Sequence, residues 1–167
     1  RYTQDAVGNR TSLLDANNHE TRFAWDELNR LTGITDAAGN VSHSDWDAVG
    51  NRTSVTDANG HTTSWEYDAL NRQTVQTDAL GNQTTYAFDA VGNRVAMVDA
   101  NGHATSYAYD AIDRLISRTD ALGHTDHWKY DAVGNQIETT DRNGHVTRFE
   151  YDAANRQTKL TDALRSG

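Results

Sequence analysis

Cysteine, proline and long hydrophobic runs are all missing from this chain of 167 residues. Without cysteine there is no disulfide framework, and nothing in the sequence indicates the redox compartment. No apolar run approaches the roughly 20 residues that a membrane-spanning helix needs. The first residues, Arg1-Tyr2-Thr3-Gln4, already belong to the repeat described below, so we expect any signal peptide to lie outside this chain.

Positive charge is also scarce, because 15 lysines and arginines face 24 acidic residues and give a formal net charge of -9. The basic residues are spread along the chain instead of forming a cationic patch, which argues against nucleic acid as a partner. Hydrophobic residues make up 36% of the sequence, fewer than in most globular domains. This composition indicates a thin structure with much of its surface in water.

Aromatic residues recur with a 21-residue period and fall into only two slots. A spacing that never slips over about eight copies predicts one array, residues 1–167, in which each copy is a structural unit stacked on the last. The leading aromatic slot holds Tyr2, Phe23, Trp65, Tyr86, Tyr107, Trp128 and Phe149, and the trailing slot, two residues later, holds Trp25, Trp46, Tyr67, Phe88, Tyr109, Tyr130 and Tyr151.

Two columns of aspartate accompany the aromatic slots, and each aspartate opens a turn signal. Segments such as Asp47-Ala48-Val49-Gly50-Asn51 and Asp57-Ala58-Asn59-Gly60 combine a capping carboxylate with a residue that accepts φ > 0, the chemistry of a hairpin loop. We call turns of the first column first turns and those of the second column second turns. The turn-capping aspartates expected in the central copies are Asp47, Asp57, Asp68, Asp78, Asp89, Asp99, Asp110 and Asp120.

The segments between the turns alternate as strands do. In residues 63–68, Thr63, Trp65 and Tyr67 share one face, and the return strand places aliphatic residues such as Leu13 and Ile34 in a recurring slot. Two turns per repeat leave two strands of about six residues. A second, 42-residue period appears in the first turns, where Gly-Asn pairs alternate with Asn-Arg or Asp-Arg pairs, a difference that would matter if the two kinds pointed to opposite sides.

The unit Trp65-Glu66-Tyr67-Asp68-Ala69-Leu70-Asn71-Arg72, followed by Asp78-Ala79-Leu80-Gly81-Asn82, resembles the YD repeat of the Rhs family over essentially the whole chain. The departures are small: Gln4 and Ser44 replace aromatic residues, and the proline common after the second aspartate is absent. The resemblance implies an all-β fold, a continuous antiparallel β-strip of two-strand repeats that curves as a segment of a hollow shell or superhelix.

The resemblance also implies a function for the strip. In bacterial Rhs proteins and insecticidal toxin complexes the shell encloses a toxic C-terminal segment, and in teneurins it belongs to an adhesion receptor. We therefore expect a structural module of a secreted or cell-surface protein that shields a passenger polypeptide. The core region and the variable toxin segment of a complete shell are missing, so we expect a fragment. The repeat pattern stops at residues 165–167. The first and last strands of such a fragment would be open sheet edges that can pair with other chains.

Several candidate sites remain open at this stage. If calcium binds, its ligands would be Asp57, Asp78, Asp99 and Asp120, but the spacing lacks the denser pattern of known calcium loops, and turn capping explains the column. Histidines such as His61 alternate with asparagine in one turn slot, which fits a polar turn residue better than a metal ligand. No arrangement of side chains specifies a catalytic centre or a cofactor site, so we do not expect an enzyme.

The aromatic slots are the remaining candidate. Both are expected on the face that also carries the aliphatic residues, so we interpret Phe23, Trp25, Trp46, Trp65, Tyr67, Tyr86, Phe88, Tyr107, Tyr109, Trp128, Tyr130, Phe149 and Tyr151 as a structural, largely buried aromatic face. One alternative function is an adhesive module that binds glycan or a surface protein through these rings. The other is a self-assembling fibre or ring subunit, in which copies join through open sheet edges.

Overall fold

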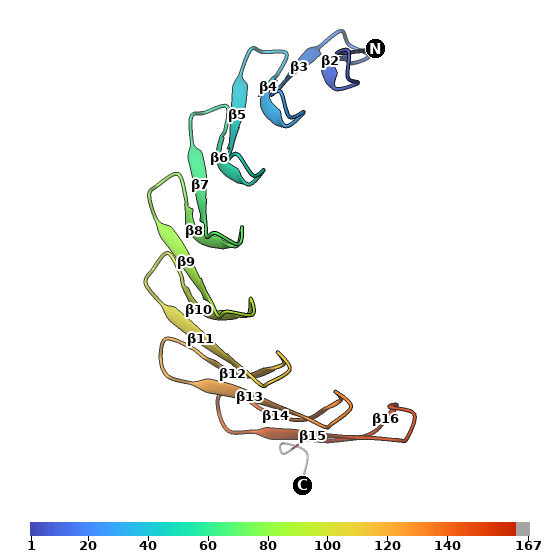
Figure 1. The fold of residues 1–167 in the computed structure, drawn as a ribbon, viewed down its shortest axis with the longest axis vertical. Coiled ribbons are helices and arrows are strands. Elements are labelled where there is room, and N and C mark those ends of the chain that lie inside the picture. The colour runs from blue at the N-terminus through green and yellow to red at the C-terminus, as the bar shows by residue number, and fades with distance from the viewer. Residues whose placement is uncertain (163–167) are drawn as a thin grey trace. The chain divides into compact units, whose positions relative to one another are not determined.

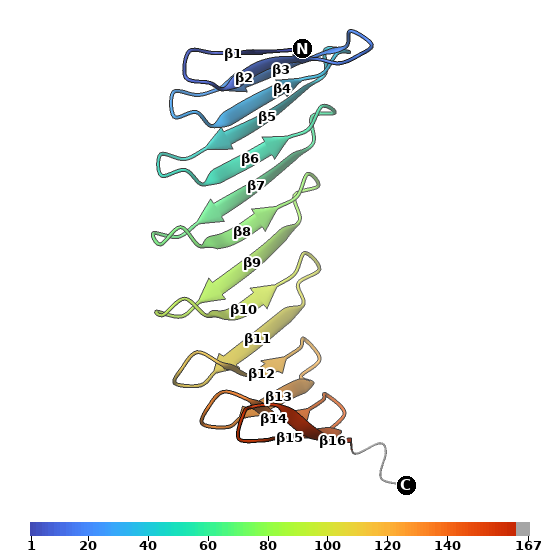
Figure 2. The ribbon, with the colours of Figure 1, turned by 90° about the vertical axis from the view of Figure 1, so that its right-hand side faces the viewer.

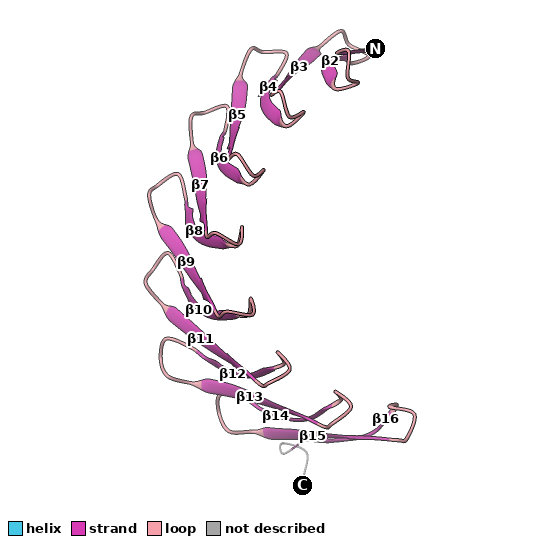
Figure 3. Cartoon of the chain, viewed as in Figure 1, coloured by secondary structure: helices cyan, strands magenta, loops and turns pink. Residues whose placement is uncertain are grey.

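Every regular element of the computed structural model is a β-strand, and the structure describes residues 1–162 (Figure 3). None of these residues forms a helix long and apolar enough to cross a membrane. The strands follow one another in sequence order in an antiparallel sheet of 16 strands, which confirms the predicted fold class. Two compact units are distinguished, residues 1–84 and the residues from Thr85 onward, and we describe each by itself.

The first unit consists of four hairpins and the start of the next strand. Each strand pairs antiparallel with the next, from β1 to β8. The bounds are β1 Tyr2–Gln4, β2 Arg10–Leu14, β3 Glu20–Trp25, β4 Leu31–Thr35, β5 Val41–Trp46, β6 Arg52–Thr56, β7 Thr62–Tyr67 and β8 Gln73–Thr77.

The second unit repeats this arrangement, and the division between the units falls within β9. Its strands pair in the same way from β9 to β16. The bounds are β9 Gln83–Phe88, β10 Arg94–Val98, β11 Ala104–Tyr109, β12 Leu115–Thr119, β13 Thr125–Tyr130, β14 Gln136–Thr140, β15 Val146–Tyr151 and β16 Gln157–Asp162.

In each unit the two kinds of turn lie along opposite edges of the strip (Figure 2). First turns join odd-numbered strands to the following even-numbered strands, and second turns join even-numbered strands to the next odd ones. Gly-Asn and Asn-Arg turns therefore alternate along the same edge. The two kinds of first turn therefore do not point to opposite sides, and the 42-residue period distinguishes neighbours on one edge.

A β-bulge occurs in every hairpin that is closed by a first turn. In the pair β7–β8, Tyr67 lies opposite Gln73 but Glu66 lies opposite Val75, which leaves Thr74 as the extra residue. The same shift recurs in all eight such hairpins. The pairings across second turns, such as β6–β7, are regular. Because a bulge bends its strand and increases the twist, the strip is distorted periodically on the first-turn side, and each unit is curved (Figure 1).

The sheet has only one layer, so no residue among the described ones is fully buried. A single sheet leaves both of its faces accessible to solvent, and its side chains can bury surface only against neighbours on the same face. The aromatic side chains are accordingly half-buried, except Tyr2, which is 61% exposed. The expectation of a largely buried aromatic face is met only in part.

Candidate binding face and the turns that support it

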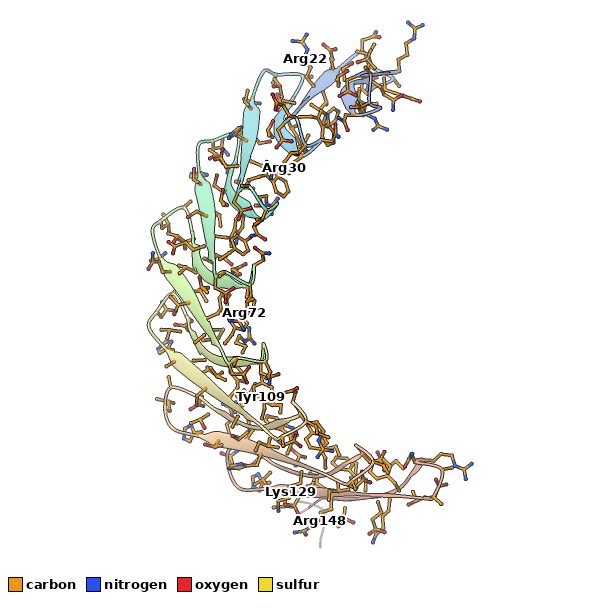
Figure 4. The ribbon with its side chains drawn as sticks, viewed as in Figure 1. Arg22, Arg30, Arg72, Tyr109, Lys129 and Arg148 are labelled. Atoms are coloured by element: carbon orange, nitrogen blue, oxygen red, sulfur yellow. The ribbon has the colours of Figure 1, made fainter. Side chains whose placement is uncertain are left out.

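The two aromatic slots lie on one face of the strip, which we call the aromatic face. In four hairpins the leading aromatic residue lies opposite an aliphatic residue of the return strand, as in Phe23 opposite Ile34 and Tyr86 opposite Met97. In three others the residue opposite the leading ring is Gln76, Arg118 or Thr139, and in β5–β6 Ser44 replaces the ring. The trailing aromatic residue lies two positions further along the same strand and so projects from the same face. In the first unit Arg30 and Arg72 mark the concave side and Arg22 the convex side; in the second unit Tyr109 and Arg148 mark the concave and convex sides, respectively (Figure 4).

Six of the seven residues in the trailing slot donate a hydrogen bond to a residue 15 positions earlier in the chain, and the seventh, Phe88, has no side-chain donor. The tryptophan or tyrosine donates from the indole Nε1 or the hydroxyl to a carbonyl of the preceding hairpin, as Tyr109 does to the carbonyl of Arg94 at 3.1 Å. Five further members of the slot do the same at 2.8–3.0 Å: Trp25, Trp46, Tyr67, Tyr130 and Tyr151. The accepting residue directly precedes the bulge, so the bulge and the ring donor act together to join consecutive hairpins.

Arginine side chains lie over several of the rings. The guanidinium of Arg94 is 5.7 Å from the ring centroid of Tyr86 and 5.0 Å from that of Tyr107, and the guanidinium of Arg52 is 5.0 Å from Trp65. Similar contacts join Arg10 to Tyr2, Arg30 to Trp46 and Arg114 to Tyr130. Cation–π attraction of this kind orders the rings.

Each turn is organised around its aspartate. In the turn that begins at Asp68, one carboxylate oxygen accepts the backbone N–H groups of Leu70 and Arg72 at 2.8 and 3.0 Å. The backbone N–H of Asn71 donates to the carbonyl of Asp68 at 2.9 Å, and Asn71 has a φ of 60°. The same frame, a three-residue loop that ends in a residue with positive φ, is present in all fifteen described turns.

The fifth residue of each turn completes the frame, although its identity varies. Its side-chain nitrogen lies at the second carboxylate oxygen of the aspartate: Arg72 Nε at 2.7 Å from Asp68, Asn82 Nδ2 at 2.9 Å from Asp78 and His61 Nδ1 at 3.0 Å from Asp57. Arginine, asparagine and histidine therefore make the same contact. This explains why histidine and asparagine alternate in one slot, as the polar-turn interpretation supposed.

These hydrogen bonds favour the charged form of the aspartates. The Arg72 side chain, followed by its backbone N–H, lowers the pKa of Asp68, and the backbone N–H of His61, followed by its ring, lowers that of Asp57. The pKa is lowered in each of the fifteen aspartates that open the described turns. Both oxygens of each carboxylate are thus engaged by the turn itself.

First turns are also linked to one another along their edge, and we call these links the turn ladder. In a Gly-Asn turn the asparagine reaches the next turn, as Asn51 Nδ2 does to Asn71 Oδ1 at 2.9 Å. In an Asn-Arg turn the arginine does so, as Arg30 Nη1 does to the carbonyl of Asp47 at 2.6 Å. The two links alternate in both units; further links start at Asn9, Asn93, Arg114 and Asn135. The 42-residue period is therefore the period of this ladder.

Comparison with known proteins agrees with this geometry. The RHS Repeat family model matches residues 5–41, 46–83, 71–104, 88–125 and 130–166, which is most of the chain. The chain belongs to the Rhs repeat family. No curated protein matches it.

Solved structures with the same fold come from toxin complexes. A TcdB2–TccC3 structure without the hypervariable C-terminal region matches 94% of this chain with a TM-score of 0.71 and 18% identity, and the Photorhabdus luminescens Tc holotoxin pore matches 86% with a TM-score of 0.68 and 16% identity. At this identity the likeness shows the fold alone. The Rhs repeat chain covers 10% and 9% of those chains.

The aspartates proposed as calcium ligands are kept apart by their turns. Asp57, Asp78, Asp99 and Asp120 each cap a different second turn with both carboxylate oxygens. Within residues 1–162 no group of three or more histidine, aspartate or glutamate side chains could hold a metal ion. The Rhs repeat turns therefore use these carboxylates for backbone capping.

An ion cluster in the second unit was not predicted. Arg118 donates to Asp126 at 2.5 Å, and the backbone N–H of Arg142 donates to the other oxygen of Asp126 at 2.9 Å. Arg142 also lies 3.4 Å from the carboxylate of Asp120. Arg118 occupies the aliphatic slot, and Arg142 replaces the alanine of other turns. These two deviations from the repeat were the available signal in the sequence. They place two cations beside Asp126, which stands at a position where the other copies have threonine or serine.

Proposed function

We propose that this chain is a wall segment of a β-shell, belongs to a secreted or surface protein, and turns its aromatic face toward an enclosed polypeptide. The observation that carries the proposal is a row of half-buried rings on the concave side of each unit, with no second layer of described residues over it. A continuous row of rings that stays partly accessible on a protein surface often marks a face that something covers.

The chemistry of the face suits contact without sequence specificity. The hydroxyl and indole donors of the trailing slot are occupied by backbone carbonyls, so they are not available to select particular polar groups of a ligand. What the face offers is mainly ring surface, interspersed with arginine and with the hydroxyl or indole donors of leading-slot residues such as Tyr107. Such a surface can shield many different passenger sequences, and the proposal assigns the chain no catalytic step.

A photo-crosslinking experiment on the protein expressed from its native gene tests this function. Tyr107 on the aromatic face and Ala108 on the opposite face are adjacent in β11, so each can be replaced by benzoylphenylalanine in turn. We expect crosslinks from position 107 to a polypeptide segment outside the repeats, and few from position 108. Equal crosslinking from both positions, or none from 107, would contradict enclosure on the aromatic face.

A second function, glycan binding by the same face, is favoured by the exposed Arg94 and the half-buried rings of Tyr86 and Tyr107 beside it. Rings and a guanidinium are suited to stacking on sugars and to holding their acidic substituents. A glycan array probed with the wild-type chain and with Tyr107→Ala tests it. Binding that is lost in the variant supports the adhesive function, and an array without signal removes it.

A further inference from the structure

Three arginines of the aromatic face have no carboxylate partner. Each follows a Gly-Asn turn and is exposed, and we call Arg10, Arg52 and Arg94 the stacked arginines. Their guanidinium groups lie over leading rings, at 5.4 Å from the centroid of Tyr2, 5.0 Å from that of Trp65 and 5.0 Å from that of Tyr107, respectively. Within residues 1–162 the three guanidinium groups make no hydrogen bond and no ion pair.

Stacking leaves the binding edge of a guanidinium available. The group contacts the ring with its planar face, so its N–H donors point outward in the plane and match a carboxylate bidentately. The arginines of the Asn-Arg turns differ, because Arg30 and Arg114 already donate to Asp26 and Asp110. The stacked arginines therefore keep the donors that bind an oxyanion.

The strand carboxylates lie almost entirely on the opposite face of the strip. There they alternate with the rings along the chain or pair with residues that do: Glu20, Asp45, Glu66, Glu138 and Glu150. On the aromatic face Asp126 is already paired with Arg118, and Asp162 belongs to the second aspartate column. The acidity of the chain, with its net charge of -9, thus resides in the turns and on the opposite face, while the aromatic face presents unpaired cations.

Apolar surface lies between the stacked arginines of the first unit. Arg10 borders a hollow of about 410 Å³, whose lining includes Phe23, Trp25 and Leu31. Ile34 lies on the same face toward Arg52, and the indole donor of Trp25 is taken by a backbone carbonyl. A sugar chain would leave hydroxyl groups unpaired against such a surface, which costs free energy, whereas a polypeptide can place apolar side chains there.

We propose that the stacked arginines bind carboxylate side chains of the enclosed polypeptide. This inference rests on the proposed function and adds to it a preference for charge, without a preference for one sequence. Arg10 and Arg52 are four strands apart, which is about 19 Å, and an extended polypeptide covers that distance in about six residues. Two acidic residues at that interval point to the same side of the extended segment and can meet both guanidinium groups at once.

Fluorescence anisotropy with a labelled peptide tests the site. The probe carries two glutamates about six residues apart with leucine and serine elsewhere, and the matched peptide has glutamine for each glutamate. We expect the wild-type chain to bind the glutamate peptide at least about tenfold more tightly, with a smaller difference at high salt. Arg10→Gln with Arg52→Gln should abolish the difference. Glutamine stands naturally in this slot at Gln73 and Gln136, and circular dichroism verifies that the variant is folded.

A matched control removes the same charge from the convex side. Arg22→Gln with Arg148→Gln should keep the preference for the glutamate peptide. Equal binding of the two peptides by the wild type overturns the inference, and so does a preference that is lost equally in the control. Tighter binding of a hyaluronan oligosaccharide than of the glutamate peptide, lost in the variant of Arg10 and Arg52, would overturn it as well and assign the arginines to a glycan.

The segment captured by photo-crosslinking separates this inference from enclosure itself. Mass spectrometry of the crosslink from position 107, beside Arg94, identifies the captured residues, and we expect aspartate or glutamate among their neighbours. A captured segment without acidic residues overturns the carboxylate inference and leaves enclosure intact. Absence of capture from position 107 contradicts enclosure and overturns both.

Discussion

The aspartate of each turn combines three roles in a single side chain. It caps two backbone N–H groups, positions the side chain of the fifth turn residue and remains ionised because those donors favour its charged form. The sequence predicted the first role from the two aspartate columns. It did not reveal the second, because arginine, asparagine and histidine are different residue types that share only a side-chain nitrogen able to reach the carboxylate.

Acid should therefore unfold the chain through its turns. Because folding lowers the aspartate pKa values, the unfolded chain binds protons first as the pH falls, and stability present at neutral pH is lost below about pH 4. We expect a thermal midpoint that falls steeply from about pH 4 downward, measured by circular dichroism. A midpoint that stays level down to pH 2.5 would show that these carboxylates do not stabilise the fold.

Substitution of Asn71 separates two contributions to a first turn. Asn71→Ala loses the acceptor for Asn51 and places a Cβ-bearing, non-polar residue at a φ of 60°, so we expect a loss of about 1–2 kcal/mol. Asn71→Gly loses the acceptor alone and should be the less destabilised variant. Urea unfolding measures both free energies. If the Asn71→Ala variant were as stable as the Asn71→Gly variant, the left-handed backbone conformation would cost alanine no stability at this position.

At the scale of the hairpin, the bulge and the hydrogen bond of the trailing ring together join one hairpin to the next. The predicted alternation of residues located the strands correctly. The bulges were not predicted, since residues such as Thr32 and Thr74 have ordinary strand propensity and nothing in their side chains indicates an extra residue. The ring's hydrogen bond escaped prediction for a related reason: its acceptor is a backbone carbonyl, which carries no sequence signal.

Two tyrosines of β11 test that hydrogen bond. Tyr109→Phe removes the donor to the carbonyl of Arg94, and we expect a loss of about 0.5–1.5 kcal/mol in the free energy of unfolding. Tyr107→Phe is the control, because no hydrogen bond to its hydroxyl is present among the described residues. Chemical denaturation of both variants gives the comparison. Equal effects would mean that the trailing slot is selected for ring packing alone.

Two arginines of the first unit test the turn ladder. Arg30 is 21% exposed and joins Asp26 to the carbonyl of Asp47, so Arg30→Ala should cost about 1–2 kcal/mol. Arg22 is 70% exposed on the convex side and pairs with Glu20, and Arg22→Ala should change stability by less than about 0.5 kcal/mol. Thermal unfolding of the two variants under one condition decides the matter. A similar loss in both would remove the ladder as a source of stability.

At the scale of the whole chain, the repeat specifies a strip whose two edges and two faces differ. The 21-residue period predicted the number and order of strands, and the resemblance to Rhs repeats predicted the fold that the comparisons confirm. The meaning of the 42-residue period could not be read from the sequence. It depends on which turns lie side by side, and only the pairing of strands determines that. The structural unit is accordingly a pair of hairpins, one with each kind of first turn.

Two deletions test this central claim. Removing residues 26–67 joins Trp25 to Asp68 and keeps Gly-Asn and Asn-Arg turns in alternation. Removing residues 26–46 instead places two Gly-Asn turns side by side. Gly50 then stands where Asn29 accepts a hydrogen bond from Asn9, and glycine has no side-chain acceptor. Stability in such arrays otherwise rises with the number of repeats. We predict that the shorter protein, which lacks two whole repeats, has the higher thermal midpoint. A higher midpoint for the longer protein, which lacks a single repeat, would contradict the claim that paired hairpins are the unit of this fold.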